Sequence, residues 1–336
     1  MTARALPQKT RWAFPRPYGS RALLILIGGA LLLWFTGQRV EIGRMVAMTS
    51  EAALVPLGLA ERSQVADGLS TAIGQLVPIQ LSERQEISRI ENFDPDHLPL
   101  FSHLEVVESR AKAINPQTMA MESRPVRATY LVQPLGYVWL VAGKMLETLE
   151  IALWGTIIAI LLGFPLALLA ARNMMRLTPL RMAARGITGF CRAVPELISA
   201  LFLVIAYGFG PIAGILALGL YGAGFLGKFY ADDVENADPG PQEALTAIGA
   251  GKLTMWRYAI LPQVLPQYIA YTLYILDRNV RMATVIGLVG AGGIGQELKG
   301  RYDMYDYAHV GTILIAILIV VLLLDRFSGR LRNALL

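Results

Sequence analysis

Six apolar runs dominate this chain of 336 residues, and most approach the roughly 20 residues that a helix needs to cross a bilayer. Hydrophobic residues make up 54% of the chain and charged residues only 16%, a balance that soluble domains rarely have. The runs cover residues 22–35, 148–171, 187–207, 211–229, 263–285 and 308–324. We therefore predict an all-α membrane protein with about six transmembrane helices.

The first run follows a basic segment, which is also typical of a secretory signal peptide. Its basic residues are Arg4, Lys9, Arg11, Arg16 and Arg21. The residues after the run, Thr36 to Arg39, contain no small-x-small cleavage site. We therefore predict that residues 1–37 form a cytoplasmic N-terminus and an uncleaved first transmembrane helix.

Arginines orient the other spans, because short loops rich in Lys and Arg stay on the cytoplasmic side. Seven follow the second or the sixth run: Arg172, Arg176, Arg181, Arg185, Arg326, Arg330 and Arg332. They predict that both termini are cytoplasmic, including a tail at 326–336. A core of five spans then covers 146–325, and residues 238–262 also fall in the cytoplasm.

Residues 38–145 are predicted to form an extracytoplasmic insertion. Up to Lys144 they hold twelve acidic and ten basic residues, so no positive bias retains them inside. The amphipathic stretches 41–54 and 65–77 are typical of helices.

Histidines offer one alternative function for this insertion. His97 and His103 lie near Asp94 and Asp96, a set that can bind a metal ion. We favour solvated loop histidines and predict no metal site. The third histidine, His309, is expected at the membrane interface.

Residues 238–262 are typical of two short helices joined by a glycine turn. Prolines open the first helix, and Glu243 is expected in its first turn, near the positive end of the helix dipole. Gly249 suits a left-handed helix cap. A moving soluble subunit can grip such a rigid unit, whereas the alternative is an ordinary interfacial helix. The residues expected at this contact are Glu243, Ala244, Leu245, Gly249, Leu253, Leu261 and Pro262.

A glycine-rich block follows the fifth apolar run. Its glycines are Gly287, Gly290, Gly292, Gly293 and Gly295. Three of them match the dinucleotide pattern G-x-G-x-x-G, but no βαβ unit surrounds them, and Ile315 stands where an acid is expected. We predict a bend that lines or gates a solute path, with close helix packing as the alternative.

Charged residues at membrane depth are costly and usually face a cavity or a partner. Arg278 and Arg281 lie three residues apart on one helix face, beside Asn279, and two cations there suit an anionic solute. We rank Asn279 and Arg281 ahead of Arg278 as path residues. The alternative is that Asp277 pairs with one arginine while the other reaches the interface.

Two further charged groups have structural explanations. Arg192 and Glu196 flank Pro195, which predicts a kink with an internal ion pair. Glu147 and Glu150, near the start of the second run, are expected either at a pore entrance or on the surface.

Several blocks of the last 190 or so residues resemble the permeases of bacterial phosphonate ABC importers. E-A-x-x-x-x-G at 243–249, followed by Leu261-Pro262, resembles the coupling motif of importer permeases in general. N-V-R-x-A-T-V-I-G-L-V-G-A-G-G-I-G at 279–295 narrows the resemblance to phosphonate and related phosphorus oxyanions. Leu245 and Ala259 depart from the general motif but remain apolar.

This resemblance implies a type I importer permease in a bacterial inner membrane. It implies a homodimer, a dimer of ATPase subunits that bind ATP and Mg²⁺, and an extracytoplasmic substrate-binding protein. It implies no cofactor on this chain and no nucleic acid partner. Phosphate or phosphite remains an alternative solute.

Two other function classes are weaker. A secondary transporter would often show internal repeats, and none is convincing here. A membrane enzyme would need acid–base or metal groups clustered at one depth, but the three histidines are scattered and no nucleophile motif such as G-x-S-x-G occurs. The chain also contains no P-loop, so it is not itself the ATPase.

Overall fold

A computed structural model describes residues 19–55, 63–90, 93–95, 98–99, 101–114 and 121–335. The chain divides into two compact units, Met1–Gly74 and Gln75–Leu336. The first unit contains α1 (Ser20–Arg39), α2 (Ile42–Leu54) and most of α3 (Gln64–Leu76). Helices α2 and α3 confirm the two helices predicted from amphipathic stretches in the insertion.

Helix α1 exposes nearly all of its apolar side chains, among them Leu24 and Trp34. Leucines on every side suit a helix that is surrounded by lipid rather than by its own chain. It is one of the helices long and apolar enough to cross a membrane.

The second unit begins with a small antiparallel sheet, in the strand order β1-β3-β2. Its strands are β1 (Glu83–Glu86), β2 (His103–Ile114) and β3 (Met121–Gln133). Residue His103 pairs with Val132 and Glu83 with Gln133, which fixes the register. The sequence did not predict this sheet.

Nine helices and one π-turn follow among the described residues of this unit. They are α4 (Gly136–Ala170), α5 (Thr178–Ala193), α6 (Glu196–Tyr207), α7 (Pro211–Asn236), α8 (Pro239–Ala247), α9 (Lys252–Met255), the π-turn Trp256–Ile260, α10 (Leu261–Gly287), α11 (Gly293–Asp303) and α12 (Tyr307–Leu335). Helix α4 starts ten residues before the predicted core at 146, so the end of the predicted insertion is helical.

Five helices in the described part of the chain are long and apolar enough to span a membrane, or six if α5 and α6 together form one span. The predicted kink at Pro195, inside the predicted span 187–207, is confirmed and is sharp, because α5 and α6 meet at an angle of 91°. Pro195 lies at this break and is the N-cap of α6. Proline lacks an N–H and disfavours a helical residue before it, so Val194 is extended.

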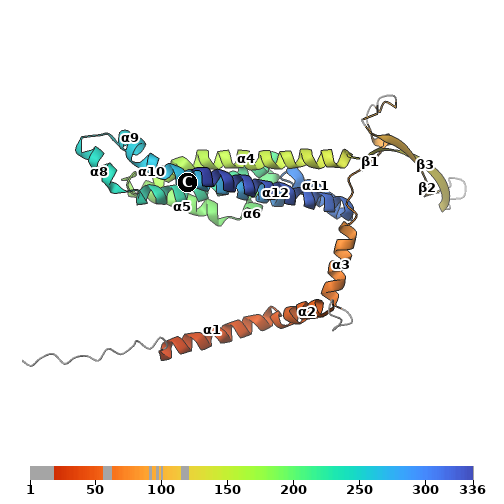
Figure 1. The fold of residues 1–336 in the computed structure, drawn as a ribbon, viewed down its shortest axis with the longest axis horizontal. Helices are drawn as coiled ribbons and strands as arrows, with labels where there is room; N and C mark the ends of the chain where they lie inside the picture. The colour runs from red at the N-terminus through yellow and green to blue at the C-terminus, as the bar shows by residue number, and fades with distance from the viewer. Residues whose placement is uncertain are drawn as a thin grey trace, which may run out of the picture. The chain divides into compact units, whose positions relative to one another are not determined.

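Small residues allow the long helices to pack closely, and their contacts show how the helices run relative to one another. Gly155 and Gly163 of α4 face Leu218 and Leu226 of α7, so these two helices are parallel and closely packed. Helix α10 runs antiparallel to α7, since Ile275 lies against Gly222 and Tyr268 against Tyr230. Helices α8 and α9 lie at one end of this bundle, and α11 and the sheet lie at the other (Figure 1).

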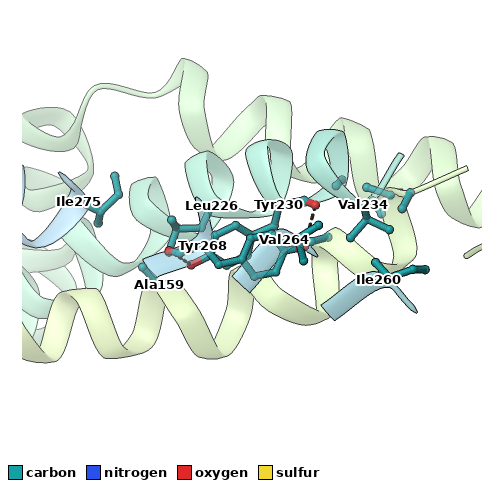
Figure 2. Close-up of a cluster of buried hydrophobic side chains, with 13 residues drawn as sticks. Ala159, Leu226, Tyr230, Val234, Ile260, Val264, Tyr268 and Ile275 are labelled. Atoms are coloured by element: carbon teal, nitrogen blue, oxygen red, sulfur yellow. Dashed lines mark hydrogen bonds between the residues drawn. The ribbon is translucent and has the colours of Figure 1, made fainter. Parts of the chain in front are cut away.

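The core near α8 and α9 is built around two tyrosines (Figure 2). The rings of Tyr230 and Tyr268 stack at 3.8 Å, and the Tyr268 hydroxyl donates a hydrogen bond to the Tyr230 carbonyl at 2.9 Å. Leu226, Val264 and Ile260 are buried around the pair. Each phenol therefore keeps a polar partner while its ring fills an apolar core.

Candidate functional site

The predicted coupling segment forms a helix, a turn and a second helix. Asp238 precedes α8, and its carboxylate accepts a hydrogen bond from the Gly240 N–H at 2.9 Å, as an N-cap residue does. Since α8 begins at Pro239, Glu243 lies in the second turn, so its predicted position in the first turn is wrong. Gly249 has φ +79°, which confirms the predicted left-handed cap.

The second helix of this segment is continuous with the following span. Residues Lys252–Gly287 form one long helix with a π-turn at Trp256–Ile260, so Leu261-Pro262 does not interrupt it. Gln263 closes the unit. Its side-chain oxygen accepts from the Asp238 N–H at 2.9 Å, and its amide donates to the Ala259 carbonyl at 2.6 Å.

Two large apolar side chains of the segment point away from the bundle. Ile248 and Leu253 are each 79% exposed, and Glu243 and Ala244 are exposed beside them. Trp256, three residues after Leu253, packs inward instead, with its ring 5.8 Å from that of Phe164. The segment is thus anchored by Trp256 and presents an apolar outer surface.

The glycine block forms a tight connection between α10 and α11. All five glycines are buried, and Gly290, Gly292 and Gly293 have positive φ. A Cβ atom at Gly295 would lie 2.0 Å from the Thr284 carbonyl oxygen, so no larger residue fits there. A role in the solute path stays a prediction.

Two side chains of α4 cap the start of α11. The Glu147 carboxylate accepts from the Gly293 N–H at 3.0 Å, and the Thr148 hydroxyl accepts from the Ile294 N–H at 2.8 Å. These bonds satisfy free N–H groups at a helix N-terminus. Glu147 is therefore a partly buried capping residue. Glu150 is exposed, in agreement with the surface position that was one of the two alternatives.

The predicted path arginines are both ion-paired, and with different helices. Arg278 pairs with the buried Glu196 of α6, and its guanidinium lies 4.0 Å from the centre of the Tyr221 ring. The internal Arg192–Glu196 pair predicted at the kink is wrong, because Glu196 turns to Arg278 instead.

Arg281 lies between two carboxylates, 2.7 Å from Asp277 and 3.1 Å from Asp325 of α12. Asn279 is fully buried and donates to the Thr156 hydroxyl of α4 at 2.9 Å, while its Oδ1 atom has no partner in the described part of the chain. Asn279 therefore joins α10 to α4, whereas Arg281 is partly exposed.

A charged cluster at the other end of the bundle was missed from the sequence. Arg301 of α11 contacts Glu83 of β1 at 3.1 Å, Glu297 at 2.9 Å and Asp306 at 3.2 Å. Burial lowers the pKa of Arg301, but its bonds to Glu297 and Glu83 outweigh burial and raise it. No local signal reveals this site, because Glu83 is 218 residues away.

His309 also belongs to this cluster and is mostly buried within the protein, while its position at the membrane interface stays a prediction. Its Nδ1 atom lies 2.7 Å from Asp306, and its ring packs edge-on against Tyr137 at 4.2 Å. Burial raises the pKa of Asp306, but the contacts with His309 and Arg301 hold it below its ordinary value. The cluster ties the sheet to α4, α11 and α12.

The histidine pair of the insertion gives no metal centre in the described residues, which contain no group of three or more possible ligands. His103 begins β2. His97 and Asp96 lie outside the described residues.

Comparison with known proteins identifies the class. Residues 163–335 match the family described as binding-protein-dependent transport system inner membrane component. The chain belongs to this family. Its members are transport subunits and not enzymes, so the predicted importer permease is confirmed.

Among curated members of the family, the chain is 56% identical over 262 residues to HtxE of Stutzerimonas stutzeri, described as a candidate phosphite transport system permease protein. That match covers 77% of this chain and 99% of HtxE. The phosphite transport system permease protein PtxC of the same organism is 43% identical, over 56% of this chain and 69% of PtxC. The phosphate-import permease protein PhnE of Mycolicibacterium smegmatis is 42% identical, over 56% of this chain and 36% of PhnE.

Solved structures agree on the fold of the permease. An inward-facing form of the MetNI methionine ABC transporter superposes with a TM-score of 0.53 at 23% identity, over 59% of this chain and 97% of that chain. An amino acid ABC transporter gives 0.51 at 18% identity, over 59% and 95%. These matches confirm the type I importer permease fold.

Proposed function

We propose that this permease forms the membrane path of an importer for phosphonate or a related phosphorus oxyanion. The observation that carries the proposal is the 56% identity to HtxE, which extends over 99% of that protein. PtxC and PhnE, whose names specify phosphite and phosphate, support the same class of solute. The solute enters from a substrate-binding protein, and a separate ATPase dimer binds ATP and Mg²⁺.

Residues 238–262 are the proposed contact with the ATPase. The exposed Ile248 and Leu253 supply apolar area, and Glu243, Ala244, Leu245 and Gly249 shape the surface around them. Because Lys252–Gly287 is one helix through Leu261 and Pro262, a displacement of the contact moves α10 as a rigid rod.

The orientation proposed for the permease places α8, α9 and both termini in the cytoplasm. Arg172, Arg176 and Arg330 lie toward that end, as the positive-inside rule expects. The sheet and residues 38–135 are then extracytoplasmic, where a binding protein docks.

A second copy of the permease is proposed to close the path. Arg281 and Asp325 are each nearly half exposed in one copy, although they lie on helices apolar enough to span a membrane. Charges at such a depth face water or a partner rather than lipid. Arg281 and Arg278 are proposed to contact the solute, which would replace their carboxylate partners. The glycines between 287 and 295 are proposed to form the bend at the outer end of the path.

The test is ATP hydrolysis by the reconstituted complex of permease, ATPase and binding protein, with phosphonates, phosphite, phosphate and sulfate. Stimulation by one phosphorus oxyanion above sulfate is expected. An assembled complex that none of them stimulates would refute the solute class but keep the importer permease. Arg281→Ala is expected to lower uptake without lowering assembly, and unchanged uptake would remove Arg281 from the path.

A further inference from the structure

A cavity of about 250 Å³ lies between α5, α7 and the end of α4. Three basic side chains line it, Arg185, Arg192 and Lys228, together with a single acid, Asp232. The main chains of α5 and α7 are close here, since a Cβ atom at Gly224 would lie 2.8 Å from the Thr188 carbonyl oxygen. Gly189 adds no side chain, so the cationic groups border open space.

These cations differ in how far they are already neutralised. Arg185 is paired with Glu235 at 2.5 Å and donates to the Ala170 carbonyl at 3.0 Å. Within the described residues, Arg192 and Lys228 form no ion pair. Arg278 and Arg281, in contrast, are already paired with carboxylates. The cavity therefore holds two cations that are free to bind an anion.

Aromatic side chains link the cavity to the polar face of α10. The Arg192 guanidinium lies 6.0 Å from the Phe229 ring centre, and Phe229 packs against Tyr271 at 5.3 Å. Phe225 continues the row to Tyr274, which borders a smaller cavity with Asp277 and Asp325. A row of aromatic contacts thus connects Arg192 to Tyr274, one turn of α10 before Arg278.

We propose that this cavity is a binding site for a small phosphorus oxyanion, held by Arg192 and Lys228. A guanidinium presents parallel N–H donors that match two oxygens of a tetrahedral anion, and an ammonium adds a second charge. The assignment of the bound anion as a phosphorus oxyanion rests on the proposed function. The site lies toward the end of the bundle that carries α8, so it would hold the anion late in transport.

The test is binding of radiolabelled inorganic phosphate to the permease–ATPase complex in phosphatidylcholine nanodiscs, with the ATPase saturated with ADP. Arg192→Gln with Lys228→Gln is expected to weaken binding at least about tenfold. Arg176→Gln, an exposed cation at the same end, is the matched control and should leave the affinity unchanged. Arg192→Lys with Lys228→Arg should retain most of the affinity, which separates lost charge from misfolding.

Nanodiscs with phosphatidylglycerol identify the source of the anion. If lipid headgroups occupy the site, they will compete with phosphate in the wild type but not in the double Gln variant. Equal phosphate affinity in the wild type and the double Gln variant, with no effect of phosphatidylglycerol, would overturn the site. The assay uses neither binding protein nor external solute, so its failure is distinguishable from failure of the proposed function.

Discussion

The two ends of the helical bundle differ in whether their characteristic side chains find partners within the chain. At the end that carries the sheet, Arg301 is surrounded by Glu83, Glu297 and Asp306, and each charge has a partner within the chain. At the other end, Ile248 and Leu253 are almost fully exposed. The charged cluster is satisfied within the chain and holds the sheet on the helices, whereas Ile248 and Leu253 offer apolar surface for a partner to cover.

The largest expected effect comes from replacing the exposed apolar residues Ile248 and Leu253. Ile248→Asp with Leu253→Asp should weaken ATPase association by at least about 100-fold, because two apolar contacts are lost and charges are introduced. Stability of the permease should change little, since both residues are exposed. Co-purification of the ATPase measures the effect, and Val106→Asp, an exposed apolar residue of β2, is the control. Undiminished co-purification of the double variant would contradict the coupling proposal.

Arg301→Met tests the charged cluster at the end of the bundle that carries the sheet. It leaves three acids without their shared cation and should lower the free energy of unfolding by about 3–5 kcal/mol. Chemical unfolding in detergent micelles measures the change. Lys299→Met, which removes only an exposed pair with Asp303, should cost about 1 kcal/mol or less. Equal losses in the two variants would show that the cluster is no more than surface charge.

Gln263→Ala examines the connection between the coupling segment and α10. Losing the bonds to Asp238 and Ala259 should lower the free energy of unfolding by about 1 kcal/mol. Uptake per ATP hydrolysed should fall as well, because α8 is no longer tied to the span. Gln267→Ala, an exposed glutamine one turn further along the helix, should change neither quantity. Unchanged uptake per ATP in Gln263→Ala would remove this tie from the coupling route.

The smallest expected effect is the pH dependence of stability that Asp306 of the charged cluster contributes. Asp306 has a pKa below its ordinary value in the folded chain. Its contribution to stability is therefore present above the unfolded pKa of about 3.9 and is lost as the pH falls through the folded value. Asp306→Asn should flatten the pH dependence of unfolding below about pH 4. Parallel pH profiles for wild type and Asp306→Asn would refute this role.

Much of the helical architecture could be predicted, because each signal was local. An apolar run must avoid water wherever it lies in the chain, so most span positions followed from hydropathy. The cap at Gly249 and the break at Pro195 depend on the backbone of one or two residues. The small sheet escaped prediction, because its strands pair across segments that are separate in the sequence, such as β1 with β3.

The partners of the charged residues could not be predicted, because they come from distant segments. Glu196 stands four residues from Arg192, yet the 91° bend turns it to Arg278. Glu147 caps a helix that begins 146 residues later. An ion pair depends on which side chains the packing brings within a few ångströms, and sequence spacing reports this only inside one helix.

The sequence by itself determined the class of this protein, an α-helical importer permease, and it located the segment 238–262 for which the coupling role is proposed. These properties follow from hydropathy, backbone preference and short motifs, which act over a few residues. Only the tertiary structure decided which cations are neutralised, which glycines are packed, and that Arg192 and Lys228 face an open cavity. Electrostatic and packing energies depend on distances between helices, which the packed bundle alone establishes.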